Sequence, residues 1–248
     1  MWSILMRFGI GAPTVTTRPS SPVVPGETAE VTVDMEGGKA DLEADALYVA
    51  VETEYEQETE EGTQHIDTTL HTEKPIGSFT LGADERRTET VEVTVPRETP
   101  VTEGHTEVWI EAGLDVGFSA DPDDWEYVEV EPSDRMQRVF DAAEELGFGL
   151  REAYPEAASG GIFSSGKPFV QELEFVPRRG RYRSELDELE LIFDPTEDAL
   201  TVTVEVDRSG GMLSEMMGAD ENKDQLVVAD QDTEAVTEEL AELIDRNM

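Results

Sequence analysis

The chain has 248 residues and no cysteine, and its 58 acidic residues against 18 basic ones give a formal net charge of −40. This composition excludes disulfides and thiolate chemistry, and it argues against nucleic acid or an anionic membrane as a bulk partner, because phosphate contacts need Lys and Arg. Apolar alternation recurs along the chain, so we interpret it as a folded, halophilic type of protein rather than a disordered one. At 1 M salt the Debye length is roughly 3 Å, which screens the repulsion within such an acidic coat.

The first segment, residues 2–10, is apolar but too short for a secretory signal with a charged flank. The sequence also has no apolar run of about 18 residues, the length that a membrane-spanning helix needs. We interpret residues 2–10 as a terminus docked on its own domain, with a membrane-touching anchor as the less favoured alternative. A cytoplasmic protein is predicted.

Residues 31–130 are predicted to form short strands separated by turn signals, a pattern that favours an antiparallel sandwich. The clearest strand is 108–118, in which every even-numbered residue is apolar, as expected for a strand with one buried face. A polar hairpin loop is predicted at 56–64. The predicted strands are 31–35, 47–55, 66–70, 79–81, 91–95, 108–118 and 127–130.

Residues 133–146 change to the spacing of a helix, with apolar side chains at Met136, Val139 and Ala143. Ser133 is a suitable N-cap, and Gly147 is a suitable residue to follow the helix. Strands are then predicted at 169–175, 189–193, 200–206 and 226–228, followed by a terminal helix over 233–246.

Several motifs in order along the chain resemble one known family. They are Phe8-Gly9-Ile10-Gly11-Ala12, Val24-Pro25-Gly26-Glu27, Val108-Trp109-Ile110 with Gly113-Leu114-Asp115, Asp121-Pro122-Asp123-Asp124 with Tyr127, Leu146-Gly147-Phe148-Gly149-Leu150-Arg151-Glu152, Pro168 to Pro177 and Glu185 to Glu190. The chain resembles the sporulation-control proteins (SpoOM type) over residues 8 to about 195. The resemblance implies two arrestin-like β-sandwiches joined end to end and a regulatory or scaffolding role without known catalysis.

The predicted fold is therefore all-β, with two arrestin-like (immunoglobulin-like) antiparallel β-sandwich domains, a connecting helix and a C-terminal helix. The predicted division is residues 1–131 for the first sandwich, 132–147 for the connecting helix, and 148–248 for the second sandwich with its terminal helix.

Motifs for catalysis or metal binding are absent from the sequence. It has no Gly-x-Ser-x-Gly elbow, P-loop or dinucleotide fingerprint. His65, His71 and His105 lack the spacing of metal ligands, so surface histidines are favoured, and neither a metal nor a cofactor is predicted. We predict a non-catalytic cytoplasmic adaptor that binds unidentified proteins, with a homodimer as one option for its oligomeric state. An enzyme or ligand carrier using a cleft between the sandwiches, and a peripheral membrane adaptor, are the alternatives.

Two groups of charged residues are candidates for partner binding or for an interdomain latch. Asp115 interrupts a core strand on the face opposite the apolar row, and the resemblance suggests a latch of opposite charges for it. Arg178, Arg179, Arg181 and Arg183 fall within six residues of a chain that has only 14 arginines. They are predicted either to pair with nearby acids in a hairpin turning at Gly180 or to bind an acidic partner. The acids considered are Glu172, Glu174, Glu185, Asp187 and Glu188.

One apolar group is a further candidate. Met212, Leu213, Met216 and Met217 form a possible contact patch of soft side chains, and packing on their own domain is the alternative.

Overall fold

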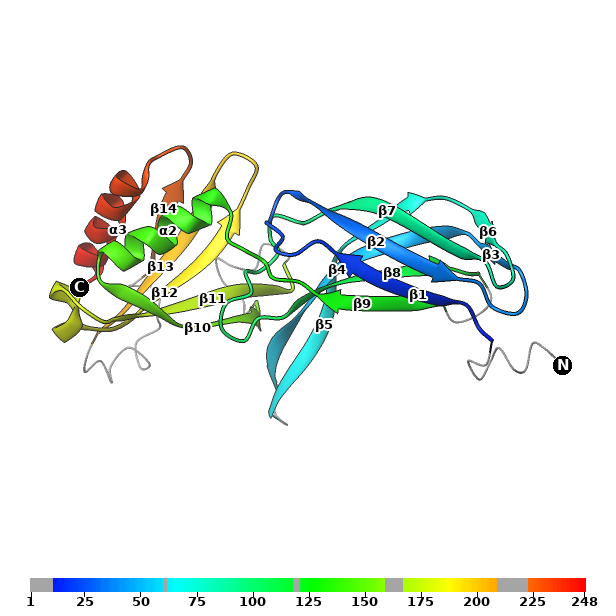
Figure 1. Cartoon of the computed structure of the whole chain (residues 1–248). Helices are drawn as coiled ribbons and strands as arrows, with labels where there is room; N and C mark the ends of the chain where they lie inside the picture. The colour runs from blue at the N-terminus through cyan, green and yellow to red at the C-terminus, as the bar shows by residue number, and fades with distance from the viewer. Residues whose placement is uncertain (1–10, 60–61, 118–120, 159–166, 209–222) are drawn as a thin grey trace. The chain divides into compact units, whose positions relative to one another are not determined.

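The computed structural model describes residues 11–59, 62–117, 121–158, 167–208 and 223–248. They form two compact units (Figure 1). The first unit comprises Met1–Thr53, Asp67–Thr99 and Glu107–Glu131, and the second comprises Glu54–Ile66, Pro100–Thr106 and Pro132–Met248. The predicted β-rich fold with a central and a terminal helix is confirmed. The N-terminal segment 2–10 and the patch formed by Met212, Leu213, Met216 and Met217 lie outside the described residues.

The first unit is a sandwich of antiparallel sheets. One sheet has the order β1-β2-β7, and the other has the order β5-β4-β8-β9. The strands of the first sheet are β1 (Thr14–Pro19), β2 (Thr28–Glu36) and β7 (Arg86–Thr94), and those of the second are β4 (Ala46–Thr59), β5 (Gly62–Ile76), β8 (Val108–Asp115) and β9 (Asp123–Tyr127). A short pair, β3 (Leu42–Ala44) and β6 (Phe79–Leu81), completes the unit.

Strand β8 shows how the two-residue period sets the core of this unit. Val108, Ile110 and Leu114 are fully or almost fully buried, and Leu114 lies opposite Leu47 of β4. Trp109 and Glu111, at the alternate positions, are on the other face. The predicted burial of the even positions is confirmed over 108–116, and Phe118 lies outside the described residues.

The second unit is built on an antiparallel sheet with the strand order β14-β13-β12-β11-β10. Helices α2 (Asp134–Glu145) and α3 (Thr233–Asn247) lie on the same face of this sheet (Figure 1). Val139 and Leu240 of the helices share one apolar core with Leu173 and Leu191 of the sheet. The strands are β10 (Phe148–Ala157), β11 (Phe169–Pro177), β12 (Leu186–Pro195), β13 (Leu200–Arg208) and β14 (Lys223–Val228), and a short 3₁₀ helix, η1 (Arg181–Ser184), connects β11 to β12.

Both helices begin and end within one or two residues of their predicted bounds. Asp232 caps α3, because its Oδ1 accepts the backbone N–H of Ala235 at 3.0 Å. Ser133 is the N-cap residue of α2, as predicted, and has extended backbone conformation, but its side chain forms no capping hydrogen bond. The helix predicted to connect the two halves thus packs as part of the second unit.

The observed strands differ from the predicted ones at several places. β9 spans Asp123–Tyr127 instead of 127–130, β1 and β3 were not predicted, and the largest differences are at the β4–β5 hairpin and at β10. The loop predicted for 56–64 is wrong, because β4 continues to Thr59 and β5 begins at Gly62. The residues at this end of β4 are mostly polar, so no apolar alternation indicated a strand there. In the structure this part of β4 belongs to the second unit: Glu56 pairs with Glu156 of β10, and the Tyr55 ring stacks on Phe169. Strand β10 itself was missed, because Gly149, Pro155 and a bulge interrupt its apolar period.

Candidate functional site

The four clustered arginines lie together at the end of β11 and in η1, and we call them the arginine segment. β11 ends at Pro177, and the backbone N–H groups of Arg178 and Arg179 both donate to the carbonyl oxygen of Gly147, at 2.9 and 3.1 Å. Gly147 has a φ of +96°, and a Cβ added there would lie 2.3 Å from the Arg179 carbonyl oxygen. The glycine that ends α2 thus allows the backbone of the arginine segment to pack against it.

Tyr182 anchors the segment to the core of the second unit. Its ring is only 1% exposed and lies 5.3 Å from the Phe148 ring, centroid to centroid. Its hydroxyl donates to Asp245 Oδ1 of α3 at 3.0 Å. Burial raises the pKa of Tyr182 to about 12, so the hydroxyl keeps its proton and remains a donor. The buried Tyr182 side chain therefore holds the backbone of the neighbouring arginines in place.

The arginine side chains are exposed and are partly held by their own unit. Arg178 donates to the carbonyl oxygen of Leu150 at 3.0 Å, and Arg179 donates to the carbonyl oxygen of Glu144 at 3.2 Å. Arg181 pairs with Asp245 at 2.8 Å and lies over the Tyr182 ring. Arg183 is exposed on the same 3₁₀ turn. These contacts leave guanidinium donors available, because each guanidinium has five.

A groove of about 400 Å³ adjoins Arg178 and Arg179. Apolar side chains line part of it, and they come from α2, β10 and β11. Charged groups of both signs also line it, so the groove can accept an apolar side chain, while carboxylates are attracted only at Arg178 and Arg179. The apolar lining residues are Phe140, Phe148, Leu150 and Phe175, and the acidic ones are Glu103, Asp141 and Glu144.

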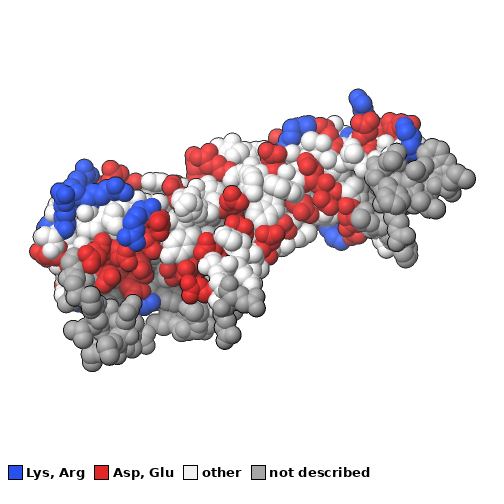
Figure 2. Space-filling view, turned by 90° about the horizontal axis from the view of Figure 1, so that it is seen from below, with Lys and Arg blue, Asp and Glu red and all other residues white. Residues whose placement is uncertain are grey.

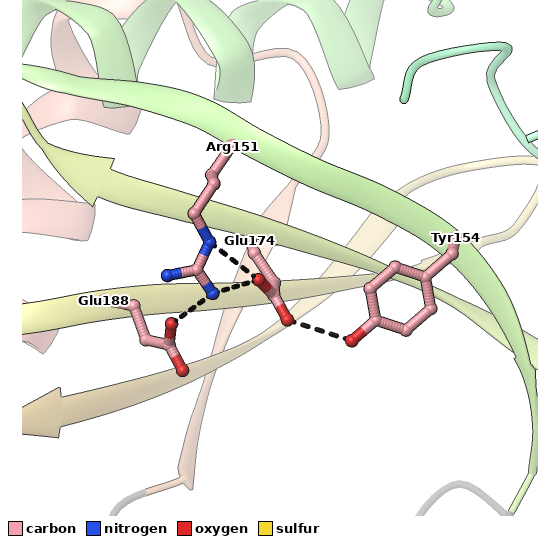
Figure 3. Close-up of polar contacts among 4 residues, drawn as sticks. All are labelled: Arg151, Tyr154, Glu174 and Glu188. Carbon is pink, nitrogen blue, oxygen red and sulfur yellow. Dashed lines mark hydrogen bonds and ion pairs between the residues drawn. The ribbon is translucent and has the colours of Figure 1, made fainter. Parts of the chain in front are cut away.

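Two of the acids that were predicted to pair with the arginine segment pair with a different arginine. Glu174 and Glu188 pair with Arg151 of β10, so the predicted pairing is wrong for both (Figure 3). Arg151 Nε lies 3.1 Å from Glu174 Oε2, and the Tyr154 hydroxyl donates to Glu174 Oε1 at 2.9 Å. Figure 3 shows all four side chains converging across neighbouring strands. Arg151 was not among the predicted candidates, because β10 was not a predicted strand.

This network belongs to a row of carboxylates on the sheet face opposite the helices. Glu174, Glu190 and Glu205 occupy directly opposed positions on β11, β12 and β13, and Lys223 of β14 follows Glu205. Glu174 is only 8% exposed. Burial, reinforced by neighbouring carboxylates, raises the pKa of Glu172 to about 7 and that of Glu190 to about 8. Within the described residues, no group of three or more His, Cys, Asp or Glu side chains has the geometry to hold a metal ion.

Asp115 lies in the first unit, half-buried near the end of β8. Its Oδ2 accepts from Lys74 Nζ of β5 at 2.6 Å. The structure therefore gives this carboxylate a partner from its own sheet. The predicted role of Asp115 in an interdomain latch stays a prediction.

Two of the histidines lie beside carboxylates. His65 lies 3.2 Å from Glu54 and 4.0 Å from Glu56, and His71 lies 3.0 Å from Glu73. In the part of the chain that the structure describes, neither helix is long and apolar enough to cross a membrane.

Comparison with known proteins gives a consistent result over nearly the whole chain. A family model described as SpoOM protein matches residues 1–210. The sporulation-control protein spo0M of Bacillus subtilis (strain 168) is 36% identical over 246 residues, which cover 96% of this chain and 95% of that protein. The crystal structure of Spo0M from Bacillus subtilis matches with a TM-score of 0.84 and 34% identity, covering 96% of this chain and all of that one. On these motifs, this fold and these matches, the chain belongs to the SpoOM protein family.

Proposed function

We propose that this chain is a non-catalytic regulatory protein of the cytoplasm that acts by binding other proteins. The name of its relative, a sporulation-control protein, supports a regulatory role. We further propose that the arginine segment, together with the adjoining groove, is one of its binding surfaces.

The observation that carries this proposal is a concentration of positive charge on a strongly negative molecule. Four of the 14 arginines lie within six residues, all four are exposed, and the chain carries a formal charge of −40. Figure 2 shows basic side chains gathered at one end of the second unit, while acidic side chains are spread in patches among uncharged ones over both units. A partner with carboxylates would be repelled by most of this surface and attracted here.

The chemistry of the surface indicates the kind of partner. Arginine pairs with carboxylates in bidentate geometry, and the groove beside Arg178 and Arg179 offers apolar contacts from Phe140 and Leu150. We therefore expect a partner segment that carries acidic residues next to an exposed apolar side chain.

The test is affinity capture from native cells in a buffer whose KCl concentration is held at about 1 M. A double variant that carries both Arg179→Glu and Arg181→Glu is compared with the unchanged chain. The matched control is Arg18→Glu with Arg86→Glu, which changes the net charge by the same amount on exposed arginines of the first unit. Loss of a partner with the first double variant and its retention with the control is the expected result. Retention of every partner by a folded Arg179→Glu, Arg181→Glu variant would overturn the proposal.

A second variant covers the case in which loss of the Arg181–Asp245 pair prevents folding. Arg179→Gln with Arg183→Gln leaves that pair and the Tyr182 anchor intact. The same partner should be lost, and its full retention would count against the arginine segment as a binding surface.

A further inference from the structure

The first unit carries an exposed group of aromatic side chains on the outer face of the β5-β4-β8-β9 sheet. Trp109 of β8 lies directly opposite Tyr127 of β9, and Trp125 of β9 lies opposite Glu111 of β8. The Trp125 and Tyr127 rings meet edge to face at 4.9 Å between centroids, and the Trp109 ring lies 6.3 Å from that of Tyr127. We call Trp109, Trp125 and Tyr127 the aromatic face.

Trp125 and Tyr127 are exposed and Trp109 is half-buried, although the other side of the sheet packs on a core of buried apolar residues. Trp125 is 48% exposed and Tyr127 is 52% exposed, and among the described residues Val227 alone joins them as an exposed large apolar side chain. The alternation of β8 assigns Val108 and Ile110 to the core and leaves Trp109 outside it. A cluster of large exposed rings on one patch marks an interaction surface more often than a scattered apolar residue does.

Carboxylates border the rings and are held by them. Trp109 Nε1 donates to Glu52 Oε2 at 2.9 Å, and the Tyr127 hydroxyl donates to Glu107 Oε2 at 3.0 Å. The Tyr48 side chain packs over Gly113, where an added Cβ would lie 2.5 Å from the Tyr48 hydroxyl oxygen. The Tyr48 hydroxyl donates to Glu111 Oε1 at 2.8 Å. The aromatic hydrogen bonds thus fix three carboxylates around the rings.

Among the residues that the structure describes, no cation forms an ion pair with these carboxylates. Within the described residues, Glu52, Glu107 and Glu111 take part in none of the salt bridges, whereas Asp115 on the same sheet pairs with Lys74. Burial raises the pKa of Glu111, and the nearby charges of Glu52 and Asp123 raise it further, as expected where negative groups lack a cation.

We propose that the aromatic face binds an arginine-bearing segment of a partner protein. A guanidinium plane stacks on Trp and Tyr rings and forms paired hydrogen bonds to a carboxylate, and this surface presents both groups side by side. Nucleic acid and anionic lipid would be repelled by the same carboxylates. The aromatic face lies in the first unit and would bind a basic segment, whereas the arginine segment lies in the second unit and would bind an acidic one. The two proposals are therefore independent of each other.

The experiment titrates the full chain in 1 M KCl with a capped peptide of alternating Arg and Ser, and follows tryptophan fluorescence. At that salt concentration the Debye length is roughly 3 Å, so diffuse attraction to the acidic coat is suppressed. The comparison peptide has Lys in place of every Arg. We expect the Arg peptide to bind about fivefold more tightly than the Lys peptide, because only a guanidinium offers both stacking and bidentate pairing.

Variants locate the binding. Trp125→Ala and Tyr127→Ala are each expected to weaken binding of the Arg peptide about fivefold, and Glu52→Gln with Glu107→Gln is expected to weaken it further. The matched control is Glu30→Gln with Glu92→Gln, a directly opposed exposed pair on the other sheet of the same unit, and it should leave binding unchanged.

Three results would overturn the proposal. The first is equal affinity for the Arg and Lys peptides. The second is that the control pair weakens binding of the Arg peptide as much as Glu52→Gln with Glu107→Gln does. The third is that Trp125→Ala and Tyr127→Ala both bind the Arg peptide as tightly as the unchanged chain. A second copy of this chain is the other candidate occupant, and sedimentation of the free chain tests for it. If the chain self-associates, and if this association is lost both in Trp125→Ala and in the double variant Arg179→Glu, Arg181→Glu, the aromatic face binds a second copy instead. Should Trp125→Ala fail to fold, Tyr127→Ser with the carboxylate variants gives the same comparison.

Discussion

Glu190 of β12 lies directly opposite Glu205 of β13 on one side and Glu174 of β11 on the other. Like charges directly opposed on neighbouring strands are destabilising, and in this row cations pair with the carboxylates at the two ends. Lys223 pairs with Glu205 at 2.7 Å at one end, and Arg151 binds Glu174 near the other. Glu190, between them, has its pKa raised to about 8 mainly by burial, and next by the charge of Glu205.

The first prediction is that raising the pH destabilises the second unit through Glu190 and Glu172. A carboxyl group whose pKa is higher in the folded state stabilises the fold fully below its ordinary pKa of about 4.5. That stabilisation is lost as the pH rises through the folded-state values of about 7 for Glu172 and about 8 for Glu190. Glu190→Gln, which mimics the protonated form, should therefore match the unchanged chain near pH 5 and melt at a higher temperature at pH 8.5.

The check is a series of melting curves at constant salt from pH 5 to pH 8.5. Glu92→Gln, on an exposed position of β7, serves as the control and should parallel the unchanged chain throughout. If Glu190→Gln and Glu92→Gln show the same pH profile, Glu190 is ionised in the folded protein at neutral pH.

The second prediction concerns Arg151, which holds the nearly buried Glu174. Arg151→Met leaves the Glu174 carboxylate with the Tyr154 hydroxyl but without its cation. We expect a loss of about 1–3 kcal/mol in the free energy of unfolding, because a buried carboxylate without its ion-pair partner is destabilising. Adding Glu174→Gln should recover part of that loss, since the unpaired charge is then removed.

Urea unfolding of the single and double variants measures this coupling. Arg86→Met breaks an exposed pair with Glu36 at 3.5 Å and should stay within about 0.5 kcal/mol of the unchanged chain. A double variant less stable than Arg151→Met alone would show that Glu174 gains nothing from being neutral there.

The third prediction tests the register of β8. Leu114 is fully buried opposite Leu47, so Leu114→Ala should cost about 2–5 kcal/mol in the free energy of unfolding. Glu92→Ala, on an exposed position, should change it by less than about 0.5 kcal/mol. Glu111→Ala should fall between them, because it removes the acceptor of the Tyr48 hydroxyl. Similar losses for Leu114→Ala and Glu92→Ala in denaturant unfolding would contradict the register.

The fourth prediction is that stability depends steeply on salt. The formal charge is −40, and several carboxylates such as Glu52 and Glu107 lie in exposed or half-buried positions outside the ion pairs described. The Debye length falls from about 10 Å at 0.1 M to roughly 3 Å at 1 M, so added KCl screens repulsion between neighbouring carboxylates. The melting temperature should rise steeply from low to molar KCl, and a flat profile over that range would refute the idea.

The sequence by itself determined which faces of the strands are buried and where the helices lie. Leu114 and Val204 are buried because the alternation of a strand gives each residue one of two faces, a property that needs no knowledge of the neighbouring strand. Helix α3 was predicted at nearly its observed bounds, because its apolar residues recur with the helical period. Motif order along the chain also identified the family.

Only the tertiary structure decided which residues meet across the chain. The apolar face of β10–β14 could be covered by another sheet or by helices, and alternation is the same in both cases; the fold places α2 and α3 there. The pairing of Arg151 with Glu174 and Glu188, and of Asp115 with Lys74, depends on which strands are neighbours and in which register. The grouping of Trp109 with Trp125 and Tyr127 has the same origin, because β9 follows a turn whose register the local sequence does not fix.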